Sequence, residues 1–161
     1  MKRFAYAAAA VAALAFGLLA ATPGHAADKE KIQKASTKTH HIVFQIDRNS
    51  KARMNLVLNN VENVIEYYRD KGEKLDVEVV AYGPGLMMLR DDKSPVKARL
   101  SNLMKVAFPA KLTYSACHNT MEKMEKQEGH PIPIVSEARI VPGGVVRLNE
   151  LQEQGWSYIK P

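Results

Sequence analysis

Cysteine is almost absent from this sequence, since Cys117 is the single one among 161 residues. A lone cysteine excludes an internal disulfide framework. The chain also lacks internal repeats and low-complexity stretches, and its 46% hydrophobic and 25% charged residues are the proportions of an ordinary soluble globular protein. This composition excludes a collagen, a disordered low-complexity chain and a multi-span membrane protein, and the length indicates one domain.

Several catalytic and nucleotide-binding patterns are missing as well. The glycine-rich turns at residues 83–85 and 143–144 match neither a phosphate-binding loop nor a dinucleotide fingerprint, and no Gly-Lys-Ser/Thr occurs. No serine, histidine and acid have a spacing that indicates a catalytic triad, and no carboxylate pair stands out as an acid and a base. The glycine-rich turns keep two interpretations, a backbone cradle for an anion and plain turn chemistry.

The first 26 residues have the layout of a secretory signal peptide. Two basic residues precede an uncharged run at residues 4–21, and a Pro-Gly pair ends it. The small residues Gly24 and Ala26 suit a signal-peptidase site, so we expect cleavage after Ala26 and a periplasmic or secreted protein with no membrane attachment afterwards. The alternative is an uncleaved membrane anchor, because the apolar run is close to the shortest length that spans a bilayer.

Residues 27–40 form a polar, basic stretch ahead of the first apolar run. We interpret this stretch as a solvated tail, since a run of charged residues usually is one. The formal net charge of +6 therefore gives no support for nucleic-acid binding, and we expect no nucleic-acid partner. The charged residues of the stretch are Asp28, Lys29, Glu30, Lys31, Lys34 and Lys38.

From residue 41 onward, short β-branched runs alternate with helical periods. This alternation predicts a single α/β domain over residues 41–161, with a mainly parallel sheet of about five strands and helices on both faces. Ser94 with Pro95, and Asn119 with Glu122, are typical of helix starts. The expected strands are residues 41–46, 76–82, 111–115, 138–141 and 156–159, with a weaker one at 132–135, and the expected helices follow the first four of the five.

The turns that follow the strands are the expected functional region. In a parallel sheet they all lie at the carboxyl ends of the strands, so segments far apart in the sequence meet along one edge. Residues 47–50, 83–85, 117–119 and 142–144 are such turns. The expected pocket rim consists of Gly83, Pro84, Gly85, His118, Asn119, Pro142, Gly143 and Gly144.

Cys117 is the expected catalytic residue. It follows a strand and comes just before a helix, whose first-turn N–H groups carry partial positive charge and favour a thiolate. A thiolate is the form that attacks sulfur. The alternative is a small buried hydrophobic side chain, which is the commonest fate of a free cysteine. For the adjacent His118 the sequence leaves three interpretations open, namely a base, a supporting partner of Cys117 or a surface residue.

Two other features keep open interpretations. Cys117 and His118, together with three more histidines and a methionine pair, offer soft ligands for copper, although no two histidines have the usual helical spacing. The further copper candidates are His40, His41, His130, Met87 and Met88. We expect no bound metal and no cofactor.

The first expected helix is rich in amide side chains near Asn59 and Asn63. These amides form either a solvated face of the helix or a contact with another subunit or with the rim.

Four segments together resemble the DsrE/DsrF-like family. They are Val-Val-Ala-Tyr-Gly-Pro-Gly at 79–85, Ser-Ala-Cys-His-Asn-Thr-Met at 115–121, Ile-Val-Pro-Gly-Gly-Val-Val at 140–146, and Gln-Gly-Trp-Ser-Tyr-Ile-Lys-Pro at 154–161. The resemblance implies a small α/β fold and a homo-oligomer, a trimer or a hexamer. In the sulfur-relay members a cysteine after a strand carries a persulfide, and Cys117 occupies the matching place.

The expected function is therefore a periplasmic sulfur-handling protein with a sulfane sulfur on Cys117. Its partners are a small sulfur-containing anion or a sulfur-acceptor protein. A cationic Arg-Gly pair that often follows the cysteine helix in relay members is here Glu128-Gly129. The alternative is a non-catalytic binding or assembly module of the same fold.

Overall fold

The computed structural model describes residues 38–161, so the predicted signal peptide and most of the predicted tail lie outside the described residues. Five strands form one parallel sheet in the order β4-β3-β2-β1-β5. This confirms the expected α/β class and strand number. The strands are β1 (Thr39–Ile46), β2 (Lys74–Ala81), β3 (Lys111–Cys117), β4 (Ala138–Val141) and β5 (Ser157–Ile159).

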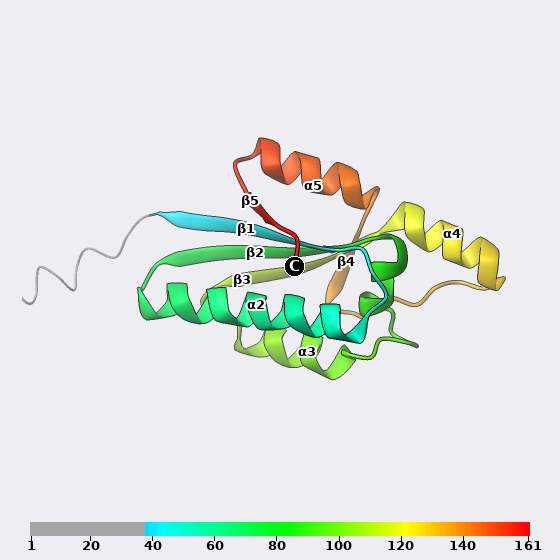
Figure 1. Ribbon diagram of the computed structural model, residues 1–161, viewed down its shortest axis with the longest axis horizontal. Helices are drawn as coiled ribbons and strands as arrows, with labels where there is room; N and C mark the ends of the chain where they lie inside the picture. The colour runs from blue at the N-terminus through cyan, green and yellow to red at the C-terminus, as the bar shows by residue number, and fades with distance from the viewer. Residues whose placement is uncertain (1–37) are drawn as a thin grey trace, which may run out of the picture. The chain divides into compact units, whose positions relative to one another are not determined.

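The helices cover both faces of this sheet, as the alternating pattern predicted. Figure 1 shows α2 and α3 together on one face and α5 on the other, with α4 beyond the edge where the strands end. The helices are α2 (Lys51–Asp70), the 3₁₀ helix η1 (Gly83–Leu89), α3 (Lys97–Val106), α4 (His118–Glu128) and α5 (Gly144–Glu153). Within residues 38–161, no helix combines the length and the apolar character needed to cross a bilayer.

The larger core lies between the sheet and the α2–α3 layer. Alternate residues of the central strands, such as Phe44, Val79 and Tyr114, point into it and are fully buried. Helix α2 contributes Met54, Val57, Leu58, Val61 and Ile65, an apolar stripe at helical spacing. Burial of this stripe is the main reason that the amide-rich α2 is stable as a helix.

The α5 face has a smaller core and a polar centre. Val43 and Val80 pack against Leu148 and Leu151 of α5, with Trp156 at the margin. The same face of the sheet also carries buried polar residues, of which Glu78 and Ser115 are bonded to one another. Apolar packing therefore anchors α5 over β1 and β2, and polar contacts replace it toward β3 and β4.

Some element boundaries differ from the sequence predictions. Helix α3 begins at Lys97 rather than Pro95, with Val96 in the N-cap position. The Ser94 hydroxyl donates to the Met88 carbonyl, which ties Ser94 to the end of η1. The strand expected at 132–135 is wrong, since only one isolated bridge, from Ile134 to Arg90, forms there. Strand β1 begins at Thr39, two residues inside the stretch interpreted as a tail.

Candidate functional site

The predicted turns do meet at the carboxyl edge of the sheet. The Gly83 N–H donates to the Thr120 hydroxyl at 2.9 Å, which ties the turn after β2 to the start of α4. The Asn119 N–H donates to the Pro142 carbonyl at 3.3 Å, which ties α4 to the turn after β4. Segments from three different parts of the sequence therefore surround the end of β3, as the parallel topology requires.

Two glycines allow this close approach. A Cβ atom on Gly85 would collide with the backbone of Ile46 and lie 2.7 Å from the Asp47 nitrogen. A Cβ atom on Gly144 would lie 2.6 Å from the Cβ of Tyr82. Both positions are thus explained by packing of backbone against neighbouring strand ends, which is the turn-chemistry interpretation of these glycines.

Cys117 is the last residue of β3 and is only 4% exposed. It pairs with Val141 of β4 and lies two residues from Ser115, so alternation directs its side chain to the α5 face of the sheet. The prediction that Asn119 caps α4 is wrong. The helix begins at His118 with Cys117 in the N-cap position, and no side chain caps it.

His118, unlike the buried Cys117, has an exposed side chain. Its side chain is half exposed, and its Nε2 lies 3.6 Å from the Glu122 carboxylate, one turn along the same helix. The imidazole thus has a partner on the surface of α4. Of the three interpretations in the sequence, the geometry fits the surface residue best.

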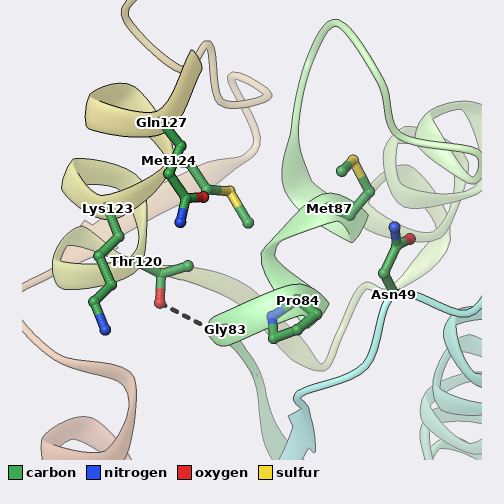
Figure 2. A pocket seen from close by; sticks show the side chains of 8 residues that line it. All are labelled: Asn49, Gly83, Pro84, Met87, Thr120, Lys123, Met124 and Gln127. Atoms are coloured by element: carbon green, nitrogen blue, oxygen red, sulfur yellow. Dashed lines mark hydrogen bonds between the residues drawn. The ribbon is translucent and has the colours of Figure 1, made fainter. Parts of the chain in front are cut away.

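A cavity of about 420 Å³ lies between η1 and α4, beside the predicted rim. Figure 2 shows Met124 of α4 pointing into the gap toward Met87, with Gly83 and Thr120 hydrogen-bonded at one end. Gly83 and Pro84 were expected rim residues, and the α4 side of the cavity was not expected. Its lining residues are Asn49, Gly83, Pro84, Met87, Thr120, Lys123, Met124 and Gln127.

A second cavity, of about 220 Å³, lies on the α5 face next to β4. It is lined by Val141, the pairing partner of Cys117, and by the predicted rim residues Pro142 and Gly143. Arg139 and Arg147 supply two guanidinium groups to its wall. Cys117 itself lines neither of these two cavities.

Both arginines hold one buried carboxylate. Glu78 of β2 is 1% exposed, and its oxygens accept hydrogen bonds from Ser115 at 2.6 Å, Arg139 at 2.8 Å and Arg147 at 2.8 and 2.9 Å. Burial acts to raise the pKa of Glu78, but the bonds from Arg147, Ser115 and Arg139 outweigh it and lower the pKa. This cluster was not predicted from the sequence, although a glutamate within the apolar run of β2 was a signal for it.

The candidate soft-metal ligands are dispersed. His40 and His41 lie at the amino end of β1, where they contact Glu73 and Asp76, whereas Cys117 lies at the carboxyl end of β3. His130 lies two residues beyond the end of α4. Across residues 38–161, no group of three or more His, Cys, Asp or Glu side chains is placed to hold a metal ion. The geometry thus gives no support to a copper site.

Comparison with known proteins gives one structural relative of note. No family model matches the sequence, and no curated protein matches it. The protein of unknown function MTH1491 from Methanobacterium thermoautotrophicum has a similar structure, with a TM-score of 0.63 and 29% sequence identity. The match covers 76% of this chain and 99% of that chain. The α/β fold with its parallel five-stranded sheet is therefore shared with MTH1491.

Proposed function

We propose that this chain is an exported sulfur carrier of the DsrE/DsrF type, with Cys117 as the persulfide-bearing residue. The observation that carries the proposal is the place of this lone thiol, at the junction of β3 and α4 on the edge where the turns converge. At 4% exposure the residue is shielded from solvent oxidants, and loading with sulfur requires local opening to expose the thiol to its donor.

The two-arginine cavity supports an anionic sulfur donor. Arg139 and Arg147 face it together with Val141, so a donor held there would approach the thiol from the α5 side. Guanidinium groups bind planar and tetrahedral oxyanions well through paired N–H donors. Both guanidinium groups also bind Glu78, and Glu150 lines the same cavity, so an anion held there would use the N–H groups that these carboxylates leave free.

The transfer step balances with thiosulfate as donor and needs no separate oxidant. On local opening, the Cys117 thiol first releases its proton to solvent. The thiolate then attacks the outer sulfur of thiosulfate, the S–S bond breaks, and its electron pair leaves with sulfite. The new Sγ–S bond holds a persulfide, and attack of an acceptor thiolate on the terminal sulfur returns the Cys117 thiolate.

Mass measurement tests this proposal. Reduced protein is incubated with thiosulfate or polysulfide and desalted, and its intact mass is then measured by mass spectrometry. We expect a gain of one sulfur atom that dithiothreitol removes and that Cys117→Ser lacks. No gain on the wild-type protein, or the same gain on Cys117→Ser, would contradict the proposal. Lys123→Gln, in the other cavity, is the matched control and should load like the wild type.

A second candidate is a non-catalytic homo-oligomeric binding module, trimeric or hexameric. The burial of Cys117 favours it too, because a thiol without access to solvent reacts slowly. Alkylation by iodoacetamide in native buffer separates the two functions. Labelling that requires denaturant, together with an oligomer whose mass by light scattering is unchanged in Cys117→Ser, would support the binding module.

A further inference from the structure

A third cavity, of about 330 Å³, lies along the opposite side of α5 from the arginine cluster and has an uncharged lining. Val145 and Leu148 form an apolar wall, and the polar groups are hydroxyls and amides. The volume is at the lower end of the range of about 300–1,000 Å³ for small-molecule sites. The lining residues are Gln45, Tyr82, Val145, Leu148, Asn149, Gln152 and Tyr158.

The orientation of Gln45 at the base of this cavity is determined by charge. Gln45 lies on β1 and is 5% exposed. Its Nε2 donates to the Asp47 carboxylate at 3.1 Å, and Lys160 also donates to that carboxylate at 2.7 Å. The bond from Lys160 lowers the pKa of Asp47, so the carboxylate is ionised and only accepts. The amide nitrogen of Gln45 must therefore face Asp47.

This orientation sets the roles of two tyrosine hydroxyls. The second N–H of Gln45 donates to the Tyr82 hydroxyl, with 2.6 Å between the heavy atoms, so the Tyr82 proton points elsewhere and is free to donate into the cavity. The Tyr158 hydroxyl donates to the Gln45 carbonyl, so only its lone pair remains for a ligand. Burial and the nearby Asp47 raise the pKa of Tyr82, which keeps it a protonated donor.

We propose that this cavity binds a small uncharged ligand through a cis-amide edge, that is, a carbonyl and an N–H side by side as in a lactam or a pyrimidine base. Tyr82 donates to the ligand carbonyl and Tyr158 accepts from the ligand N–H. The ligand amide then mirrors the Gln45 amide across the two hydroxyls and closes a ring of four hydrogen bonds. This inference is independent of the sulfur chemistry of Cys117.

The lining favours an uncharged ligand over a charged one. Asp47 and Lys160 neutralise one another behind Gln45, and none of the residues that line the cavity carries a charge. On α5, the amide groups of Asn149 and Gln152 donate to Glu153 and to the Leu148 carbonyl, so their oxygens remain available as further acceptors. A pyrimidine base has a second N–H that could donate to one of these oxygens, whereas a simple lactam has no second N–H and would leave them unused.

Titration with small probes, followed by ¹H–¹⁵N NMR, tests the inference on the purified protein. The probes are 2-pyrrolidone, which is a lactam, and uracil, which is a pyrimidine base; N-methyl-2-pyrrolidone, which lacks the N–H, is the control compound. We expect saturable shifts at the Gln45 side-chain amide and at Val145, with the N-methyl compound roughly tenfold weaker because one hydrogen bond is lost. The probe that binds more tightly shows whether the ligand class is a lactam or a pyrimidine base.

Single-atom variants complete the test. Tyr82→Phe and Tyr158→Phe keep their rings and each remove one hydroxyl, so both should weaken binding by about fivefold to tenfold. Tyr67→Phe, an exposed position on α2, should bind like the wild type, and so should Cys117→Ser. Absence of saturable shifts with both probes, equal binding of the N-methyl compound, or wild-type binding by Tyr158→Phe would overturn the inference.

Discussion

At the scale of single residues, Gly85 shows how closely the turn after β2 packs on the end of β1. A Cβ atom there would overlap the Ile46 carbonyl, which is backbone and has no freedom to move aside. We expect Gly85→Ala to lower the free energy of unfolding by about 3 kcal/mol, the upper part of the range for overpacking. Urea denaturation followed by circular dichroism measures this loss.

Gly129→Ala is the matched control for that variant. Gly129 has φ of +75° and no atom within 4 Å of its virtual Cβ, so alanine there costs only the left-handed backbone, about 1 kcal/mol. If both variants lose the same stability, crowding at the turn is not what requires glycine at position 85.

Other single-residue properties divide into predictable and unpredictable ones. Cys117 could be singled out from the sequence because it is the one cysteine and follows a β-branched and aromatic run. Its burial could not, because Cys117 pairs with Val141 of β4, which is distant in sequence. Glu78 and Gln45 gave weaker signals, since a polar residue in a strand has a buried role only when its partners are known, and those partners lie on β3, α5 and β5.

At the scale of elements, Arg99 explains the amides in the middle of α2. Its guanidinium donates to the Asn55 and Asn59 side chains at 2.9 Å and lies 3.4 Å from the Glu62 carboxylate, which joins α3 to α2. Asn59 is therefore not simply solvated, whereas Asn63 is exposed to solvent. We expect Arg99→Met to cost about 1 kcal/mol of unfolding free energy, because these bonds are partly exposed.

Thermal unfolding with calorimetry measures the effect of Arg99→Met. Arg53→Met is the control, since Arg53 is exposed on the first turn of α2 and lies on the opposite side of that helix from its neighbour Asn55. A loss for Arg99→Met no larger than that of the control would show that the amides of α2 do not hold α3.

The helix starts were the least predictable parts of the elements. Ser94 and Asn119 both suit a helix cap by residue type, and neither takes that position. At Asn119 the reason is long-range, because its N–H is taken by the Pro142 carbonyl from the turn after β4. As a result, Cys117 itself becomes the N-cap residue and ends β3 rather than following it.

At the scale of the whole molecule, the parallel sheet and the shared edge followed from the alternation of strands and helices alone. The strand order did not, because alternation permits several orders with the same right-handed crossovers. The cavities were also beyond prediction. Each is lined by residues from at least two separated segments, such as Asn49 with Met124, whose distance depends on the packing of α4.

Two carboxylate clusters make the stability of the whole molecule dependent on acid. Besides Glu78, the fully buried Arg90 binds both Asp92 and Glu128. Hydrogen bonds from Arg90 and Lys93 lower the pKa of Glu128 to about 2 from its ordinary 4.5, and Arg90 lowers the pKa of Asp92. A depressed pKa in the folded state stabilises the fold above the unfolded-state pKa, and this stabilisation is lost as the pH falls through the folded-state value.

We therefore expect the urea midpoint to be nearly constant from pH 7 to pH 5 and to fall steadily from about pH 4.5 toward pH 2. Glu78→Gln should cost about 3 kcal/mol at pH 7, because it leaves Arg139 and Arg147 without their buried partner. That variant should also lose less of its remaining stability on acidification than the wild type does. Glu122→Gln, exposed on α4, should keep the wild-type pH profile. A wild-type midpoint that does not change between pH 5 and pH 3, or an unchanged acid dependence in Glu78→Gln, would mean that Glu78 does not couple protonation to folding.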